Sequence, residues 1–199
     1  MKTLHATDLH DPKKQESILD AAIDIFAEHG FRTTDVQDIA DTAEVGKGTV
    51  YRYFGNKESL FQAAADAGMQ RMEQHINKVV RDESTPDEHV RAVGMAYADF
   101  FQKNPQLVEI LIQERAEFRG SIPDTHLFYR QKNRGEFEKV LRQGINNGTF
   151  RKVNVKEATN AFANMLYGTV VCGVLEGNSL SIRRTAKHAI EIFLQGILA

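Results

Sequence analysis

Hydrophobic residues recur every three or four positions along almost the whole chain. This spacing places them on one face of an α-helix, and alternating apolar and polar runs flanked by turn signals are absent. Glycine, proline and asparagine interrupt the pattern at intervals, where helices are expected to end. The sequence predicts an all-α protein of about nine helices, over residues 13–29, 36–43, 47–54, 57–81, 86–103, 105–119, 122–146, 155–175 and 182–197.

The breaks in this pattern divide the chain into three parts. Residues 1–12 are polar, end in Asp-Pro, and are expected to form a flexible arm. Residues 13–57 hold three helices, of which the second has Thr34 or Asp35 as a candidate N-cap. Residues 58–199 hold the remaining helices and are expected to form a larger domain.

The second and third predicted helices form a helix-turn-helix, since both are short and a tight connection with a glycine joins them at residues 44–46. In such a unit the second helix enters the major groove of DNA. The whole chain has a formal net charge of −2 and a pI near 6.4. Residues 46–57, however, hold Lys47, Arg52 and Lys57 and no acidic residue, so this segment is locally basic.

Polar residues of this segment suit contacts with DNA. Lys47 can reach a guanine edge, Thr49 can touch a phosphate or a thymine methyl, and the hydroxyls of Tyr51 and Tyr53 can donate to phosphates. Lys57, at the start of the fourth helix, can hold a phosphate electrostatically. Residues 50 and 54, a valine and a phenylalanine four apart, are expected to face a small core instead.

These residues carry a family resemblance. The runs ILDAAIDIFAEHGF (18–31) and TTDVQDIADTAEVGKGTVYRYFGNKESLF (33–61) resemble the N-terminal domain of the tetracycline-repressor (TetR) family of bacterial regulators. Asp35 departs from the pattern, because the family often has a second threonine there; an aspartate caps a helix well but repels phosphate. The DNA-contacting residues expected from the motif are Thr34, Lys47, Gly48, Thr49, Tyr51, Arg52, Tyr53 and Lys57.

For the rest of the chain the resemblance is architectural, and it implies a homodimer built from the last two helices. Those helices mix small and large apolar residues, which suits a four-helix interface with two-fold symmetry. The residues expected in this interface are Phe162, Thr169, Gly173, Ile182, Ala186, Ala189, Ile190 and Phe193.

The resemblance also implies a ligand cavity among the middle helices, where aromatic residues collect. Arg115, Asn133 or Gln113 can orient a ligand there. The expected lining is Phe100, Phe101, Leu107, Ile110, Leu111, Arg115, Phe118, Tyr129, Asn133, Phe137, Phe162 and Met165. A ligand that prefers a spread-apart dimer weakens DNA binding by its differential affinity for that state. We therefore expect a repressor that leaves a palindromic operator when a small apolar or aromatic ligand binds.

Composition and local spacing argue against several other classes of protein, namely disulfide-linked, metal-binding, membrane-spanning and secreted proteins. Cys172 is the single cysteine, which excludes an intramolecular disulfide framework and a cysteine-based zinc site. The histidines show no metal-ligand spacing, so neither a metal nor another cofactor is expected. The longest nearly apolar run, residues 168–175, is far shorter than the roughly 20 residues that span a bilayer, and the N-terminus lacks a signal-peptide core. We expect a cytoplasmic protein.

Two alternatives stay open. The same fold can serve an activator or a DNA-binding protein that responds to no ligand. A helical enzyme would need a base in the middle of the chain, such as Glu109, Glu114 or Glu117, but no nucleophile and base stand together in the sequence, so we expect no enzyme.

Overall fold

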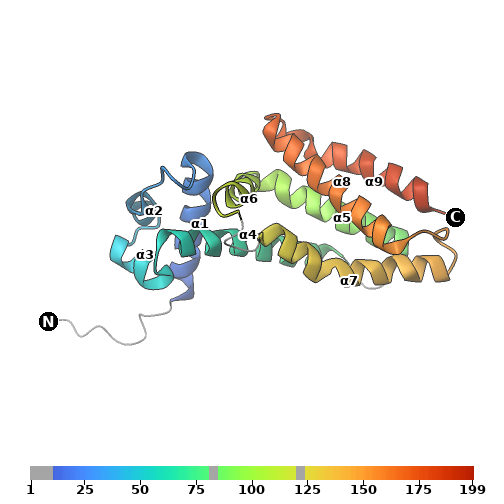
Figure 1. Cartoon of the computed structure of the whole chain (residues 1–199), viewed down its shortest axis with the longest axis horizontal. Helices are drawn as coiled ribbons and strands as arrows, with labels where there is room; N and C mark the ends of the chain where they lie inside the picture. Colours follow the sequence, from blue (N-terminus) through green and yellow to red (C-terminus); the bar gives the residue numbers. More distant parts are fainter. Residues whose placement is uncertain (1–10, 81–84, 120–123) are drawn as a thin grey trace. The chain divides into compact units, whose positions relative to one another are not determined.

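The computed structural model describes residues 11–80, 85–119 and 124–199, and nearly all of its regular structure is helical (Figure 1). The one exception in these ranges is an isolated bridge between Phe150 and Leu198. This confirms the expected all-α fold. The helices are α1 (Pro12–His29), α2 (Val36–Thr42), α3 (Lys47–Phe54), α4 (Lys57–Val79), α5 (Pro86–Lys103), α6 (Gln106–Glu117), α7 (Thr125–Asn146), α8 (Val155–Leu175), the 3₁₀-helix Ser179–Ser181, and α9 (Ile182–Ile197).

Capping residues explain where the helices begin and end. Asp11 and Asp35 accept backbone N–H groups two residues later, at the starts of α1 and α2. Gly30 and Gly55 end α1 and α3 with positive φ angles of 83° and 80°, which glycine adopts without a steric penalty. Asp124 caps α7, which begins at Thr125. The start expected for this helix, at residue 122 or 123, lies outside the described residues. The end expected for α4, at residue 81, lies outside them as well.

The chain divides into two compact units. The helix-turn-helix unit comprises Met1–Gly68 together with Glu109–Ile122, and the C-terminal unit comprises Met69–Val108 together with Pro123–Ala199. The first part of α4 and most of α6 thus join the three N-terminal helices. The sequence pattern places the division at residues 57/58 instead, because α4 and α6 carry no break in their helical periodicity at the points where they change units.

Four phenylalanines form the centre of the helix-turn-helix unit. Phe26 from α1 and Phe61 from α4 are fully buried, with ring centroids 5.1 Å apart. Phe31 and Phe118 complete the cluster, with centroids 4.8 Å apart. Edge-to-face packing of this kind stabilises a core beyond its buried area. It fastens the segment after α6 to the helices that carry the helix-turn-helix.

The C-terminal unit is a bundle in which α5, α7, α8 and α9 lie side by side (Figure 1). Gly94 lets α5 approach its neighbours closely, since a Cβ there would lie 2.6 Å from Ile190 and 3.0 Å from Phe162. By length and composition α8 is the one described helix that could also cross a membrane. In this bundle it packs against α5, α7 and α9, and 28% of its most apolar stretch is buried.

Candidate DNA-binding surface and effector cavity

Helix α3 presents a polar face to solvent and buries a single side chain. Val50 is 1% exposed and packs into the core, as its spacing predicts. Tyr51 is 40% exposed, and Gly48 and Arg52 are exposed as well. The N-cap of α3 is Gly46, so no side chain caps the first turn of this helix.

Lys47 is held by an acidic partner on the same surface. Its Nζ lies 2.7 Å from Oδ1 of Asp35, and this ion pair raises the pKa of the lysine. The pKa of Asp35 is lowered, first by the N–H of Gln37 and then by Lys47. Asp35 therefore has two partners: it caps α2 and it draws Lys47 toward that cap.

Two of the expected DNA contacts are used inside the unit. Thr34 is 3% exposed, and its hydroxyl donates to the carbonyl of Gly30 at 2.7 Å. This corrects the expectation for Thr34, because a buried side chain with an internal acceptor does not reach a phosphate. The hydroxyl of Tyr53 accepts from the backbone N–H of Asp11 at 3.0 Å, which links α3 to the start of α1.

Lys57 lies at the first position of α4 and is half-buried. Its Nζ donates to the carbonyl of Arg32 at 3.2 Å and lies 5.0 Å from the ring centroid of Phe31. Burial lowers the pKa of this lysine. The cation is thus positioned by the chain between α1 and α2.

Helix α6 supplies a link within this unit that the sequence pattern did not predict. Gln113 donates to the carbonyl of Phe26 at 2.9 Å and accepts from the N–H of Phe31 at 3.0 Å, bridging the turn that ends α1. Arg32 and Glu117 form an ion pair with a 2.7 Å separation. No periodicity signals such a link, because its partners lie more than 80 residues apart.

The C-terminal unit contains a cavity of about 490 Å³, a volume typical of sites for small organic ligands. Side chains from α4, α5, α7 and α8 line it, and most of its surface is apolar. The apolar and aromatic members are Met69, Met72, Ile76, Val80, Val93, Tyr97, Tyr129, Phe137, Phe162, Ala163 and Leu166, and the polar ones are Glu73, Asn77, His89, His126, Arg130, Asn133, Arg134, Glu136, Thr159 and Asn160.

A tyrosine and a histidine meet at the cavity wall. The hydroxyl of Tyr97 lies 3.2 Å from Nε2 of His126, whose ring centroid lies 4.5 Å from that of Tyr167. Burial lowers the pKa of His126 to about 4 and raises that of Tyr97. Both groups are therefore neutral at pH 7, and the tyrosine proton can be donated to the unprotonated ring nitrogen.

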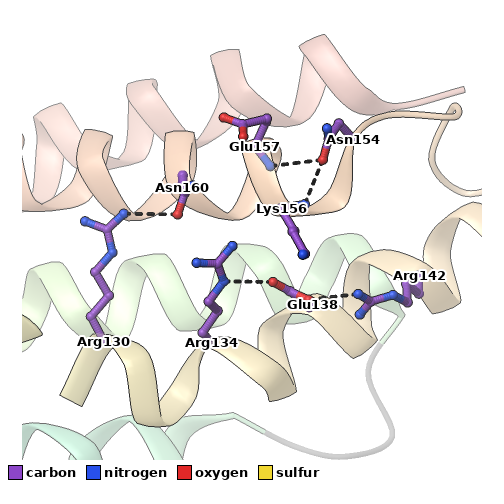
Figure 2. Close-up of polar contacts among 8 residues, drawn as sticks. All are labelled: Arg130, Arg134, Glu138, Arg142, Asn154, Lys156, Glu157 and Asn160. Carbon is purple, nitrogen blue, oxygen red and sulfur yellow. Dashed lines mark hydrogen bonds and ion pairs between the residues drawn. The ribbon is translucent and has the colours of Figure 1, made fainter. Parts of the chain in front are cut away.

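Three arginines of α7 lie near this cavity, and one of them contacts α8. Figure 2 shows Arg130 meeting Asn160, and Arg134 and Arg142 on either side of Glu138. Both ion pairs of Glu138 measure 2.8 Å and lower the pKa of its carboxyl group. The trio keeps a net positive charge, because two guanidinium groups share one carboxylate.

Both units match known protein families. Residues 18–64 match the family model for bacterial regulatory proteins of the tetR family, and residues 83–197 match the tetracyclin repressor-like C-terminal domain. The chain belongs to the tetR family of bacterial regulatory proteins. It is a DNA-binding transcriptional regulator, and regulators of this family typically act as dimers with small-molecule effectors.

Relatives of this tetR-family regulator match nearly its whole length. The fatty acid metabolism regulator protein of Bacillus subtilis is 26% identical over 193 residues, covering 92% of this chain and 95% of that protein. The transcriptional repressor KstR2 of Mycobacterium tuberculosis is 26% identical over 186 residues, covering 92% of each. The structure of the fatty acid degradation regulator FadR from Bacillus halodurans shares the fold, with a TM-score of 0.77 and 22% identity over 93% of this chain and 96% of that one.

The tetR-family structure brings only some of the expected ligand residues to the cavity. Tyr129, Asn133, Phe137 and Phe162 line it. The other expected residues do not belong to its lining: Phe100, Phe101, Leu107 and Met165 lie elsewhere in the C-terminal unit, and Ile110, Leu111, Arg115 and Phe118 belong to the helix-turn-helix unit. Most of the apolar ones fill cores instead. The sequence pattern missed Arg130 and His126, since only the packing of α7 reveals which side of that helix faces the cavity.

Most residues expected in the dimer interface lie inside one chain. Ile182, Ala186 and Ile190 are at most 1% exposed, so they hold α9 onto the bundle and are not available to a partner. Gly173 is buried against Ile182. Phe162 and Phe193 contact each other, Thr169 donates to the carbonyl of Met165, and Ala189 is half-buried. The apolar side chains that α8, α9 and their connection leave most exposed are Leu175, Leu180 and Ile192.

The carboxylates weighed for an enzyme do not line the cavity. Glu109, Glu114 and Glu117 lie on α6 in the helix-turn-helix unit, and Glu117 is paired with Arg32. The relatives named above are regulators as well.

Proposed function

We propose that this regulator is a cytoplasmic repressor whose homodimer binds a palindromic operator and is released by a small, largely apolar ligand. One observation carries the proposal: a chain with an exposed basic recognition helix also holds a largely apolar cavity of about 490 Å³ in its C-terminal unit. A ligand that prefers one arrangement of the dimer changes operator affinity through that preference.

The proposed operator contacts come from α3 and from the first residue of α4. Exposed Arg52 and Tyr51 are suited to phosphates, and Lys47 and Thr49 to base edges. An isolated unit of this size offers few phosphate contacts, so a dimer that reads two half-sites about 34–36 Å apart is expected. The full proposed set is Lys47, Gly48, Thr49, Tyr51, Arg52, Tyr53 and Lys57.

The proposed dimer uses the outward faces of α8 and α9. Leu175 is 65% exposed, Leu180 is 84% exposed and Ile192 is 70% exposed. Large apolar side chains that a chain leaves exposed on consecutive elements are candidates for an interaction site. Two copies of this helix pair would form a four-helix interface with two-fold symmetry.

The test begins with selection of duplexes from a random DNA pool by the full chain, followed by size analysis of the complex. A single palindrome bound by a dimer is expected. Gel shifts on that palindrome should then show at least tenfold weaker binding for Arg52→Ala, with the salt slope reduced by about one. The matched control is Arg115→Gln, which removes the same charge from an exposed position on α6.

Three results would contradict parts of this proposal. If no sequence is enriched at low salt, α3 does not read DNA. If Arg52→Ala and Arg115→Gln weaken binding equally, the assigned contact is wrong. If the operator is bound but no compound changes its affinity, the regulator acts without an effector, and reporter expression would then decide between repression and activation.

A further inference from the structure

The acidic residues that line the cavity have their charges balanced. Glu73 pairs with Lys132 and Glu136 with Lys139, each at 2.7 Å. Lys132, supported by Asn133, lowers the pKa of Glu73 and keeps it ionised. These pairs add no net charge to the wall of the cavity.

Arg130 is the exception among the charged lining residues. Its guanidinium is held by amides: it donates to Oδ1 of Asn164 at 2.7 Å and to Oδ1 of Asn160 at 3.4 Å. Within the described residues it has no ion pair with a carboxylate. These two bonds orient the guanidinium without neutralising it, and they occupy two of its five N–H donors. Figure 2 shows the side chain crossing from α7 toward α8.

The other arginine of the lining is paired. Arg134 is bound by Glu138, which also binds Arg142 from outside the lining (Figure 2). Burial has the largest effect on the pKa values of Tyr97 and His126, and the charge of Arg130 additionally lowers both of them. The Tyr97–His126 pair thus lies within the field of this guanidinium.

Thr159 provides a second, independent sign of a missing partner. It lines the cavity next to Asn160, it is 6% exposed, and its hydroxyl oxygen is buried with no hydrogen-bond partner. A buried hydroxyl without a hydrogen-bond partner destabilises the folded chain. A rotation of this side chain that turns the hydroxyl toward the cavity would let a ligand oxygen satisfy it.

We propose that the effector is an apolar monocarboxylate, whose carboxylate is bound by Arg130 and accepts a hydrogen bond from Thr159. Its apolar body lies against Met69, Met72, Val93, Phe137, Phe162 and Leu166. This inference rests on the proposed function and names the ligand class of the same cavity. A guanidinium matches the two oxygens of a carboxylate with parallel N–H bonds.

The charge balance favours a carboxylate over a phosphate monoester. A phosphate monoester carries about 1.5 to 2 negative charges at pH 7. The wall offers one unpaired guanidinium, and Glu73 and Glu136 lie on the same lining. A monoanion leaves no excess charge in this largely apolar space.

The experiment compares carboxylates with alcohols of the same shape. Binding of decanoate, 1-decanol, 4-phenylbutyrate and 4-phenyl-1-butanol to the full chain is measured by calorimetry. The wild type should bind each carboxylate at least tenfold more tightly than its alcohol. Arg130→Gln should lose this tenfold preference and keep its affinity for the alcohols. The control Arg142→Gln removes the same charge from outside the lining and should stay within about twofold of the wild type.

A second variant tests the same site without depending on the folding of Arg130→Gln. Asn160→Ala leaves the guanidinium charge but removes one of its two amide supports, so a partial loss of carboxylate affinity is expected. The proposal is overturned if the wild type binds alcohols as tightly as carboxylates, if Arg130→Gln keeps the preference, or if neither carboxylate binds at millimolar concentration.

Gel shifts with the same compounds separate this inference from the proposed function. If carboxylates bind through Arg130 but the operator stays bound, the carboxylate site is correct and the proposed control of operator binding by this cavity is wrong. If alcohols release the operator from both the wild type and Arg130→Gln, the proposed control of operator binding is correct and the carboxylate site is wrong.

Discussion

Asp35 combines two effects that act in opposite directions on DNA binding. Its carboxylate caps α2 through the N–H of Gln37, which orients the helix-turn-helix. The same oxygen holds Lys47 at 2.7 Å and places a negative charge where phosphates are expected to approach. The family often has a threonine at this position, and the basic residue that the aspartate affects is Lys47.

We predict that Asp35→Asn increases operator affinity. An asparagine caps a helix about as well as an aspartate, while Lys47 loses its ion pair and a repulsive charge disappears. Affinity should rise by roughly five- to tenfold, and the salt slope should steepen by about 0.9, the change for one added phosphate contact. Gel shifts over a range of salt concentrations measure both. Unchanged affinity and slope would show that Lys47 does not contact DNA.

His126 makes stability depend on pH at the scale of a single residue. Below pH 6.5 the unfolded chain takes up a proton on this histidine, whereas the folded chain does so only near pH 4, since burial lowers the pKa of the ring. The stability that depends on the neutral ring is therefore complete above pH 6.5 and is lost as the pH falls toward 4. The free energy of unfolding should fall by about 2 kcal/mol between pH 7 and pH 5 from this group.

Urea denaturation at several pH values tests this effect. His126→Asn should flatten the dependence between pH 7 and pH 5. Tyr97→Phe serves as the control, because it removes the hydrogen bond but leaves the histidine buried, and most of the dependence should remain. An unchanged slope in His126→Asn would rule out this histidine as the cause.

At the scale of elements, glycines decide how closely segments pack on α7. Gly144 lies directly beneath Phe150, whose ring is 2% exposed and would overlap a Cβ at that position. Gly135, in the same helix, is open, since a Cβ there would meet no atom within 4 Å. The two positions look alike in sequence, and only the course of the chain after α7 separates them.

We predict opposite effects for the two alanine substitutions in α7. Gly144→Ala should lower the free energy of unfolding by about 1–3 kcal/mol, because an aromatic ring in a filled core has little room to move. Gly135→Ala should raise it by up to about 1 kcal/mol through helix propensity. Thermal and urea denaturation give both values. Equal effects would mean that Phe150 can move aside at little cost.

At the scale of the whole molecule, the outward face of α9 is proposed to join two chains. Ile192 stands on the side of α9 opposite the buried Ile190 and Leu194. The other apolar side chains of α9 mostly face the bundle, and its exposed side is largely polar. An isoleucine exposed on that side is a candidate contact with a second chain. Dimer formation would couple both recognition helices to one palindrome.

We predict that Ile192→Glu shifts the chain toward monomer and weakens binding to a palindrome by at least tenfold, while the helical content is retained. Sedimentation and gel shifts on full and half operators measure these effects. The control is Lys187→Gln, which changes the charge equally and lies roughly 140° around the helix from Ile192. A variant that stays dimeric would place the interface elsewhere.

Local chemistry determines most of the helices of this chain. Caps such as Asp35, glycines such as Gly30, and a period near 3.6 residues act between neighbouring residues, and so α5, α8 and α9 match the bounds expected from the sequence alone. The basic recognition segment and the inward position of Val50 also follow from neighbouring residues.

Only the tertiary structure decided which side chains face a cavity, a partner or a core. Phe100 and Phe137 are both aromatic residues on helices, yet only Phe137 lines the cavity. Ile182 and Ile192 both suit an interface, yet Ile182 is buried within the chain. The link of Gln113 to α1 and the unpaired charge of Arg130 depend on residues distant in sequence. Periodicity identifies the apolar side of a helix, but the element that covers that side is determined by packing across the whole chain.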